Sequence, residues 1–287
     1  MGSISKSDFG SLPDGQKATL YTLRNTKGAS VKVTDFGARI VGWRAMGKDY
    51  AYVNLLPEGP DVAYYSQFCP VSGAARLSEH KLETTLWKAQ EEYDGIVFST
   101  AIDGTDLSVQ YSFSNDNEIL IRYKMTSVTP MVPVVTKIPL KVDATLENMS
   151  VLIQADEVIA DGSETVSSVA HTNLDLRGFT RADSLAYLTG DELWSVRDVP
   201  PEIEMEPGMF GYDPTCPIDY LDSGLKKAAI IQGKNTKVTI NIFTNMPSLS
   251  LRPCDKAQAL ALECCDPKPV TPRTPWLAQT VLSVKVG

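Results

Sequence analysis

The chain contains short runs in which apolar and polar residues alternate. Alternation with a period of two, bounded by turn-forming residues, is typical of β-strands that bury one face. The runs are residues 18–23, 30–34, 96–102, 107–113, 118–125, 151–154, 237–243 and 280–286. Turn-forming residues separate them, namely Pro13-Asp14-Gly15, Thr26-Lys27-Gly28, Asp103-Gly104, Asn115-Asp116-Asn117 and Lys234-Asn235. This spacing predicts a meandering antiparallel sheet system.

Helical periodicity is scarce, and the best candidate is the short segment 180–188, bounded by Gly178 and Gly190. No solenoid-type repeat, low-complexity tract or flexible linker divides the chain. We therefore predict an all-β protein, a large antiparallel β-sandwich, with an N-terminal tail at residues 1–8 and one domain at residues 9–287. Proline-rich residues 199–207 and 266–275 are predicted loops and candidate ligand contacts.

Composition narrows the class of partner. The 287 residues are 43% hydrophobic and carry a net charge of −8, and their positive charges are scattered. This charge disfavours nucleic acid and anionic membranes, so we expect a small-molecule partner. No apolar stretch is long enough to span a membrane, and the opening MGSISKSDFG lacks the apolar region of a signal peptide. We therefore expect a cytoplasmic protein. The sequence leaves the oligomeric state open.

Cofactor motifs are missing from the sequence. The five cysteines are widely spaced without a C-x-x-C pair, and neither a P-loop nor a G-x-G-x-x-G motif occurs. We accordingly expect no metal, no cofactor and no disulfide framework. The adjacent Cys264 and Cys265 lie in a strand-like run, where small buried packing residues are the favoured interpretation.

Several segments resemble, in the same order along the chain, the signature stretches of the aldose 1-epimerase family. They are FGSLPDG at 9–15, YTLRN at 21–25 with Gly28, DFGARI at 35–40, IQAD at 153–156, TNLDLR at 172–177, GYD at 211–213, TNMP at 244–247 and LE at 262–263. The resemblance runs from about residue 9 to the C-terminus, and its strength lies in this order. It implies the galactose mutarotase-like β-sandwich, with a pocket on a concave face.

A mutarotase opens and recloses a cyclic hemiacetal, which requires one group to take the anomeric hydroxyl proton and another to donate to the ring oxygen. In the family a late glutamate is the base, and the resemblance places Glu263 in that role. Leu260, Leu262 and Cys264 alternate with Glu263, which leaves open whether its side chain faces a pocket or the surface.

The family's acid is a histidine, and this chain lacks it. The corresponding region is 132–141, where the position falls on Ile138 or Pro139, and neither side chain can transfer a proton. Lys137 and Lys141 lie beside the vacated position, and a lysine desolvated in a pocket can act as a proton donor near neutral pH. Lys137 is therefore the candidate replacement, against the alternative of solvated lysines at a sheet edge.

The expected substrate-binding residues also depart from the family. Asp213, which the resemblance implies binds sugar hydroxyls, is followed by Pro214 where the family has histidine. Tyr212, Arg76 and His80 complete the candidate substrate-binding set. The alternatives are a turn cap for Asp213, a surface arginine for Arg76 and a structural histidine for His80. Fewer polar partners remain for a polyhydroxylated sugar.

These observations favour a mutarotase-like isomerase or cyclase that acts by acid–base chemistry on a cyclic hemiacetal, lactol or carbonyl metabolite less polar than a sugar. One alternative is a non-catalytic carbohydrate-binding or assembly subunit, in which the acidic residues are relics. A true aldose 1-epimerase that uses substitute groups is the other alternative.

Overall fold

The computed structural model is nearly all β, which confirms the predicted fold class. It describes residues 2–46, 51–66, 71–72, 82–144, 149–153, 157–160, 164–165, 184–189, 192–198, 225–246, 248–254, 259–265 and 269–286. Helix within these ranges is confined to α1 (Val62–Tyr65) and a 3₁₀ turn at Leu82–Thr84. No helix in the described part of the chain is long and apolar enough to cross a membrane.

The first layer is an antiparallel N-terminal sheet in which the strands follow their order in the chain. Its strands are β1 (Ser3–Ser11), β2 (Lys17–Arg24), β3 (Ser30–Thr34), β4 (Arg39–Met46) and β5 (Tyr52–Asn54). Residues 3–8, which we expected in a tail, lie in β1 and pair with β2 from Ser3 opposite Arg24. The single domain over residues 9–287 stays a prediction.

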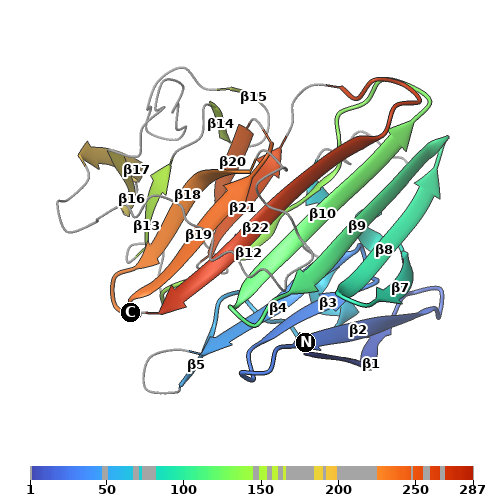
Figure 1. The fold of residues 1–287 in the computed structure, drawn as a ribbon, viewed down its shortest axis with the longest axis horizontal. Coiled ribbons are helices and arrows are strands. Elements are labelled where there is room, and N and C mark those ends of the chain that lie inside the picture. The colour runs from blue at the N-terminus through green and yellow to red at the C-terminus, as the bar shows by residue number, and fades with distance from the viewer. Residues whose placement is uncertain are drawn as a thin grey trace.

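A ten-stranded sheet forms the largest layer, and Figure 1 shows its long strands side by side across the molecule. Its order is β17-β16-β13-β18-β19-β22-β10-β9-β8-β7. The strands are β7 (Lys88–Glu92), β8 (Gly95–Ile102), β9 (Thr105–Phe113), β10 (Glu118–Ser127), β13 (Met149–Ile153), β16 (Ser184–Thr189), β17 (Glu192–Asp198), β18 (Lys226–Gly233), β19 (Val238–Thr244) and β22 (Trp276–Val286).

A second five-stranded sheet, here called the site sheet, has the order β12-β21-β20-β14-β15. Its strands are β12 (Ile138–Leu140), β21 (Ala259–Cys265), β20 (Ser248–Cys254), β14 (Glu157–Ala160) and β15 (Glu164–Thr165). Just before β12, β11 (Val135–Thr136) pairs with β6 (Val71–Ser72). The β14–β20 pair is parallel, an exception among the described pairs to the expected antiparallel arrangement.

The predicted strands and turns are confirmed, and the predicted helix is wrong. The runs lie in β2, β3, β8, β9, β10, β13, β19 and β22, with ends that differ by a few residues. The β8–β9 turn has positive φ at both Asp103 and Gly104, as a tight two-residue hairpin requires. Residues 184–188 of the expected helix instead lie in β16, because β13 and β17 pair with it on both sides. Sheet pairing here overrides a weak helical pattern.

One apolar core joins the layers. Val31 and Trp43 of the N-terminal sheet, Phe98 of the ten-stranded sheet and Leu260 of the site sheet belong to the same buried cluster. The rings of Tyr21 and Phe98 meet edge to face with centroids 5.7 Å apart. Burial of this apolar surface is the main force that holds the layers together.

The family-like DFGARI segment has a structural role. Arg39 is buried, and its guanidinium donates hydrogen bonds to the backbone carbonyls of Phe36, Tyr65 and Glu83. Gly37 has φ of 70°, and a Cβ there would lie 2.7 Å from the Glu83 carbonyl oxygen. Only glycine suits this conformation and this close approach.

Asp143 attaches the segment after β12 to the turn between β18 and β19. Its Oδ2 accepts a hydrogen bond from the Asn235 backbone N–H at 2.7 Å, and its Oδ1 accepts one from the Ala144 backbone N–H at 2.7 Å. Burial by itself would raise the pKa of Asp143, but the hydrogen bonds from Asn235, Ala144 and Thr236 outweigh it and the pKa lies below its ordinary value. The carboxylate form is therefore the one that stabilises this junction.

We predict that Asp143→Ala lowers the free energy of unfolding by about 3 kcal/mol at pH 7, because several partly buried N–H groups lose a charged acceptor. A depressed pKa contributes stability above the ordinary value of about 3.9, and this contribution is lost as the pH falls toward the folded-state pKa. Urea unfolding between pH 7 and pH 3 should therefore show a steeper loss of stability in the wild type than in Asp143→Asn. Equal slopes would contradict the assignment.

Candidate functional site

Lys137 and Glu263 meet across the edge of the site sheet. The pairing of β12 with β21 places Ile138 opposite Leu262, and the same register carried one residue further brings Lys137 opposite Glu263. Lys137 Nζ lies 2.9 Å from Glu263 Oε1, and the two side chains are 21% and 6% exposed. The two residues expected to carry acid–base chemistry thus form one ion pair.

The orientation of the Glu263 side chain follows from which residues of β21 pack into the core. Leu260 and Cys264 of β21 belong to the main core. Successive side chains of a strand point to opposite faces, so Glu263 and Ala261 lie on the face of β21 that is turned away from that core. Glu263 is nevertheless only 5% exposed, which contradicts the interpretation as a surface glutamate.

Burial of the Glu263 carboxylate explains why it needs a charged partner. A carboxylate taken out of water without a partner costs several kcal/mol, and a cation at hydrogen-bond distance offsets that cost. Lys137 supplies this cation from the position just before the edge strand β12 and keeps some contact with solvent. The result is a lysine and a glutamate in direct contact, with little exposure of either side chain to solvent.

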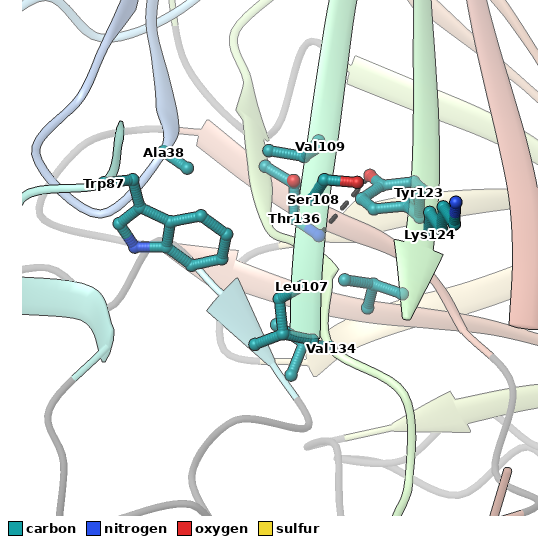
Figure 2. Close-up of a pocket in the computed structure, with 10 residues that line it drawn as sticks. Ala38, Trp87, Leu107, Ser108, Val109, Tyr123, Lys124, Val134 and Thr136 are labelled. Carbon is teal, nitrogen blue, oxygen red and sulfur yellow. Dashed lines mark hydrogen bonds between the residues drawn. The ribbon is translucent and has the colours of Figure 1, made fainter. Parts of the chain in front are cut away.

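Buried hydroxyl groups hold the backbone immediately before Lys137. Tyr111 Oη donates to the Ala38 carbonyl at 2.8 Å and lies 3.2 Å from Thr136 Oγ1. The Thr136 backbone N–H donates to Tyr123 Oη at 3.4 Å, the dashed contact in Figure 2. We refer to Tyr111, Tyr123 and Thr136 as the tyrosine clamp.

The clamp tyrosines keep their phenolic protons. Burial raises the pKa of Tyr111 and also raises the pKa of Tyr123, in each case as the largest effect. Both phenols are therefore hydrogen-bonding groups and not proton-transfer groups. The sequence carried no signal for this role, because alternation in β9 and β10 marks the two tyrosines simply as core residues.

A small cavity lies against the clamp. Trp87, Leu107, Val109 and Val134 line it together with Tyr123, as Figure 2 shows. Its volume of about 20 Å³ is enough for roughly one water molecule. It is too small to be the substrate pocket.

Cys264, next to Glu263, is a packing residue. It is buried in the main core, and burial raises the pKa of its thiol to about 12. The expected packing role of Cys264 agrees with this environment, whereas the side chain of Cys265 lies outside the described residues. Within the described ranges, no three His, Cys, Asp or Glu side chains gather in a way that would hold a metal ion.

The expected substrate-binding residues Asp213, Tyr212, Arg76 and His80 lie outside the described residues, as does the predicted loop 199–207. Their convergence with Glu263 in one cleft stays a prediction. Residues 269–275 of the second predicted loop form turns and irregular backbone, as expected.

Comparison with known proteins adds two findings and one negative result. No protein-family model matches the chain. The chain is 23% identical over 286 residues to the aldose 1-epimerases of Escherichia coli K12 and Shigella flexneri, covering 83% of this chain and 79% of each relative.

Solved structures with the same overall fold include the GalM/aldose epimerase homologue from C. elegans and galactose 1-epimerase from Lactobacillus acidophilus. Each matches with a TM-score of 0.63 over 100% of both chains, at 10% and 13% identity respectively. The structural neighbours show that the chain has the galactose mutarotase-like fold, and the sequence relatives make it similar to the aldose 1-epimerases.

Proposed function

We propose that the protein is a mutarotase-like isomerase or cyclase whose acid–base pair is Lys137 and Glu263. Its substrate would be a cyclic hemiacetal, lactol or carbonyl compound less polar than a sugar. The observation that carries this proposal is the 2.9 Å contact between Lys137 and the buried Glu263, which the resemblance assigns to the family's base. The aldose 1-epimerase relatives support the class of reaction.

The reaction follows from the two groups. The Glu263 carboxylate takes the proton of the anomeric hydroxyl while the Lys137 ammonium donates a proton to the ring oxygen, and the bond between the anomeric carbon and the ring oxygen breaks. Rotation of the resulting carbonyl group exposes its other face. Reclosure returns the proton from Glu263 and restores the proton to Lys137. Both residues end in their starting state, and no other reactant is consumed.

The position of Pro139 in the site sheet supports Lys137 as the general acid. Ile138 lies in the main core, whereas Pro139 pairs with Ala261 and so lies on the same face of the site sheet as Glu263. Of the two positions that align with the family's histidine, Pro139 is therefore the one on the side of the reaction. Proline carries no proton to donate, and Lys137 is the adjacent group that does.

A non-catalytic carbohydrate-binding or assembly protein is the second candidate. It is favoured by the direct ion pair itself, because Lys137 neutralises Glu263 in the same way that a structural partner would. The two candidates differ in whether the Glu263 carboxylate acts as a proton acceptor in a reaction: the isomerase requires it, and the non-catalytic protein does not. A true aldose 1-epimerase, the third candidate, differs from both because it would catalyse the mutarotation of galactose.

We predict slow or undetectable mutarotation of freshly dissolved α-D-galactose. We predict faster conversion of sugars that have fewer hydroxyl groups than galactose, such as a 2,6-dideoxyhexose. Each sugar hydroxyl left unpaired in a pocket adds roughly 1–3 kcal/mol of cost. Polarimetry with and without protein measures both rates. Strong acceleration with galactose that Glu263→Gln abolishes would identify an ordinary aldose 1-epimerase instead.

The roles of the pair are separable by substitution. We expect Glu263→Gln and Lys137→Arg each to lower kcat on the best substrate by about 10²–10⁴. Lys137→Arg keeps the ion pair and the fold, but a guanidinium does not release its proton. Lys141→Arg is the matched control, and its rate should equal that of the wild type. A fully active Lys137→Arg variant would show that Lys137 is not the acid.

The tyrosine clamp is expected to position Lys137. Tyr111→Phe deprives the Ala38 carbonyl and the Thr136 hydroxyl of a buried partner, so we predict a loss of about 1–3 kcal/mol in unfolding free energy. We also predict a fall in kcat with little change in KM, because Lys137 shifts relative to Glu263. Tyr93→Phe is the control, since Tyr93 is 83% exposed and should leave stability and kcat unchanged. A fall in stability without the fall in kcat would assign Tyr111 a purely structural role.

A further inference from the structure

Four neighbouring strands of the ten-stranded sheet place two lysines and two serines in one row. Lys88 of β7 is directly opposite Ser99 of β8, Ser99 is opposite Ser108 of β9, and Ser108 is opposite Lys124 of β10. Directly opposed residues share a face, and four strands span roughly 14 Å. The row therefore reads ammonium, hydroxyl, hydroxyl, ammonium across the sheet.

This row lies on the outer face of the sheet. Phe98, Val109 and Tyr123, the neighbours of the row in β8, β9 and β10, belong to the main core. Alternation then directs Ser99, Ser108 and Lys124 away from that core. The Lys137–Glu263 pair belongs to a different layer, so the row is separate from the proposed reaction site.

A groove follows the row. Short serine side chains lie between long lysine side chains, which leaves the middle of the row lower than its ends. The groove has a volume of about 550 Å³ and is also lined by Ala101, Asp106 and Thr126. These three form the adjacent row, in which Ala101 and Thr126 both pair with Asp106. Its size falls in the range of ligand sites, and its lining is rich in hydroxyl groups.

The charge of the groove opposes that of the chain. The protein carries a net charge of −8, yet two ammonium groups flank this groove against the single carboxylate of Asp106. Among the residues that the structure describes, neither Lys88 nor Lys124 forms an ion pair. Both ammonium groups are thus available to an anionic ligand.

We propose that this groove binds an acidic oligosaccharide. Lys88 and Lys124 would hold carboxylates of separate sugar units, and the hydroxyl groups of Ser99, Ser108 and Thr126 would exchange hydrogen bonds with the sugar hydroxyls. A ligand that carries charges at intervals and hydroxyls between them matches the row in both respects. Exposed charges and hydroxyls give weak contacts, so the affinity is modest, with a Kd on the order of 1 mM.

Amide NMR titration of the isotope-labelled full-length protein with tri-galacturonic acid tests the proposal. We expect saturable shifts for residues of β7 to β10, weakened about 2- to 5-fold by Lys88→Gln or Lys124→Gln and more by the double variant. Binding should also weaken when salt rises from about 0.02 M to about 0.5 M, because the charges are exposed. Lys17→Gln, which removes an exposed lysine from β2, is the matched control and should bind like the wild type.

Two further probes identify the ligand chemistry. Maltotriose, which has the hydroxyls without the carboxylates, and inorganic phosphate, which has charge without a sugar, should each bind at least several-fold more weakly. Binding of maltotriose as tight as that of tri-galacturonic acid would overturn the role of the lysines. Equal binding of phosphate would overturn the saccharide assignment, and absence of shifts in β7 to β10 would overturn the site. None of these outcomes depends on the activity of Glu263.

Discussion

The shared apolar core is the constraint on which the other features of this structure depend. Successive side chains of a β-strand point to opposite faces of the sheet. When one residue of a strand packs into the core, its neighbours in that strand therefore lie on the other face. Leu260 and Cys264 face the core, and Glu263 therefore faces away from it. The same rule, applied to Phe98, Val109 and Tyr123, places the Lys88 to Lys124 row on the outer face of the ten-stranded sheet.

Several polar groups that the layers bury have specific hydrogen-bond partners. Arg39 donates to backbone carbonyls, Asp143 accepts from backbone N–H groups, and the tyrosine clamp joins Ala38, in the turn before β4, to Thr136. Except for the bond from Arg39 to Phe36, these contacts join segments that lie far apart in the chain. Because a buried polar group without a partner is costly, they determine how the layers fit together more specifically than apolar packing alone does.

The Lys137–Glu263 pair belongs to this pattern and also departs from it. Its two partners are charged side chains, whereas Arg39 and Asp143 bond mainly to backbone groups. A buried ion pair is weak evidence for stability, because desolvation can cancel the attraction between the charges. The resemblance assigns Glu263 to the family's base and places a proline or an isoleucine where the family has its acid, and this expectation is what supports the proposed chemical role over a structural one.

Sequence alone determined the strands, the tight turns and the family resemblance, because alternation, turn chemistry and order along the chain are local or linear properties. It also identified Glu263 and Lys137 as candidates. Their contact, the burial of Glu263, the role of the tyrosine clamp and the groove over β7 to β10 were decided only by tertiary structure. The register between β12 and β21, which brings Lys137 opposite Glu263, depends on strands that are distant in the chain, and no local pattern encodes it. The weak helical pattern at 180–188 was overruled for the same reason, since pairing with β13 and β17 supplies hydrogen bonds that no isolated segment can make.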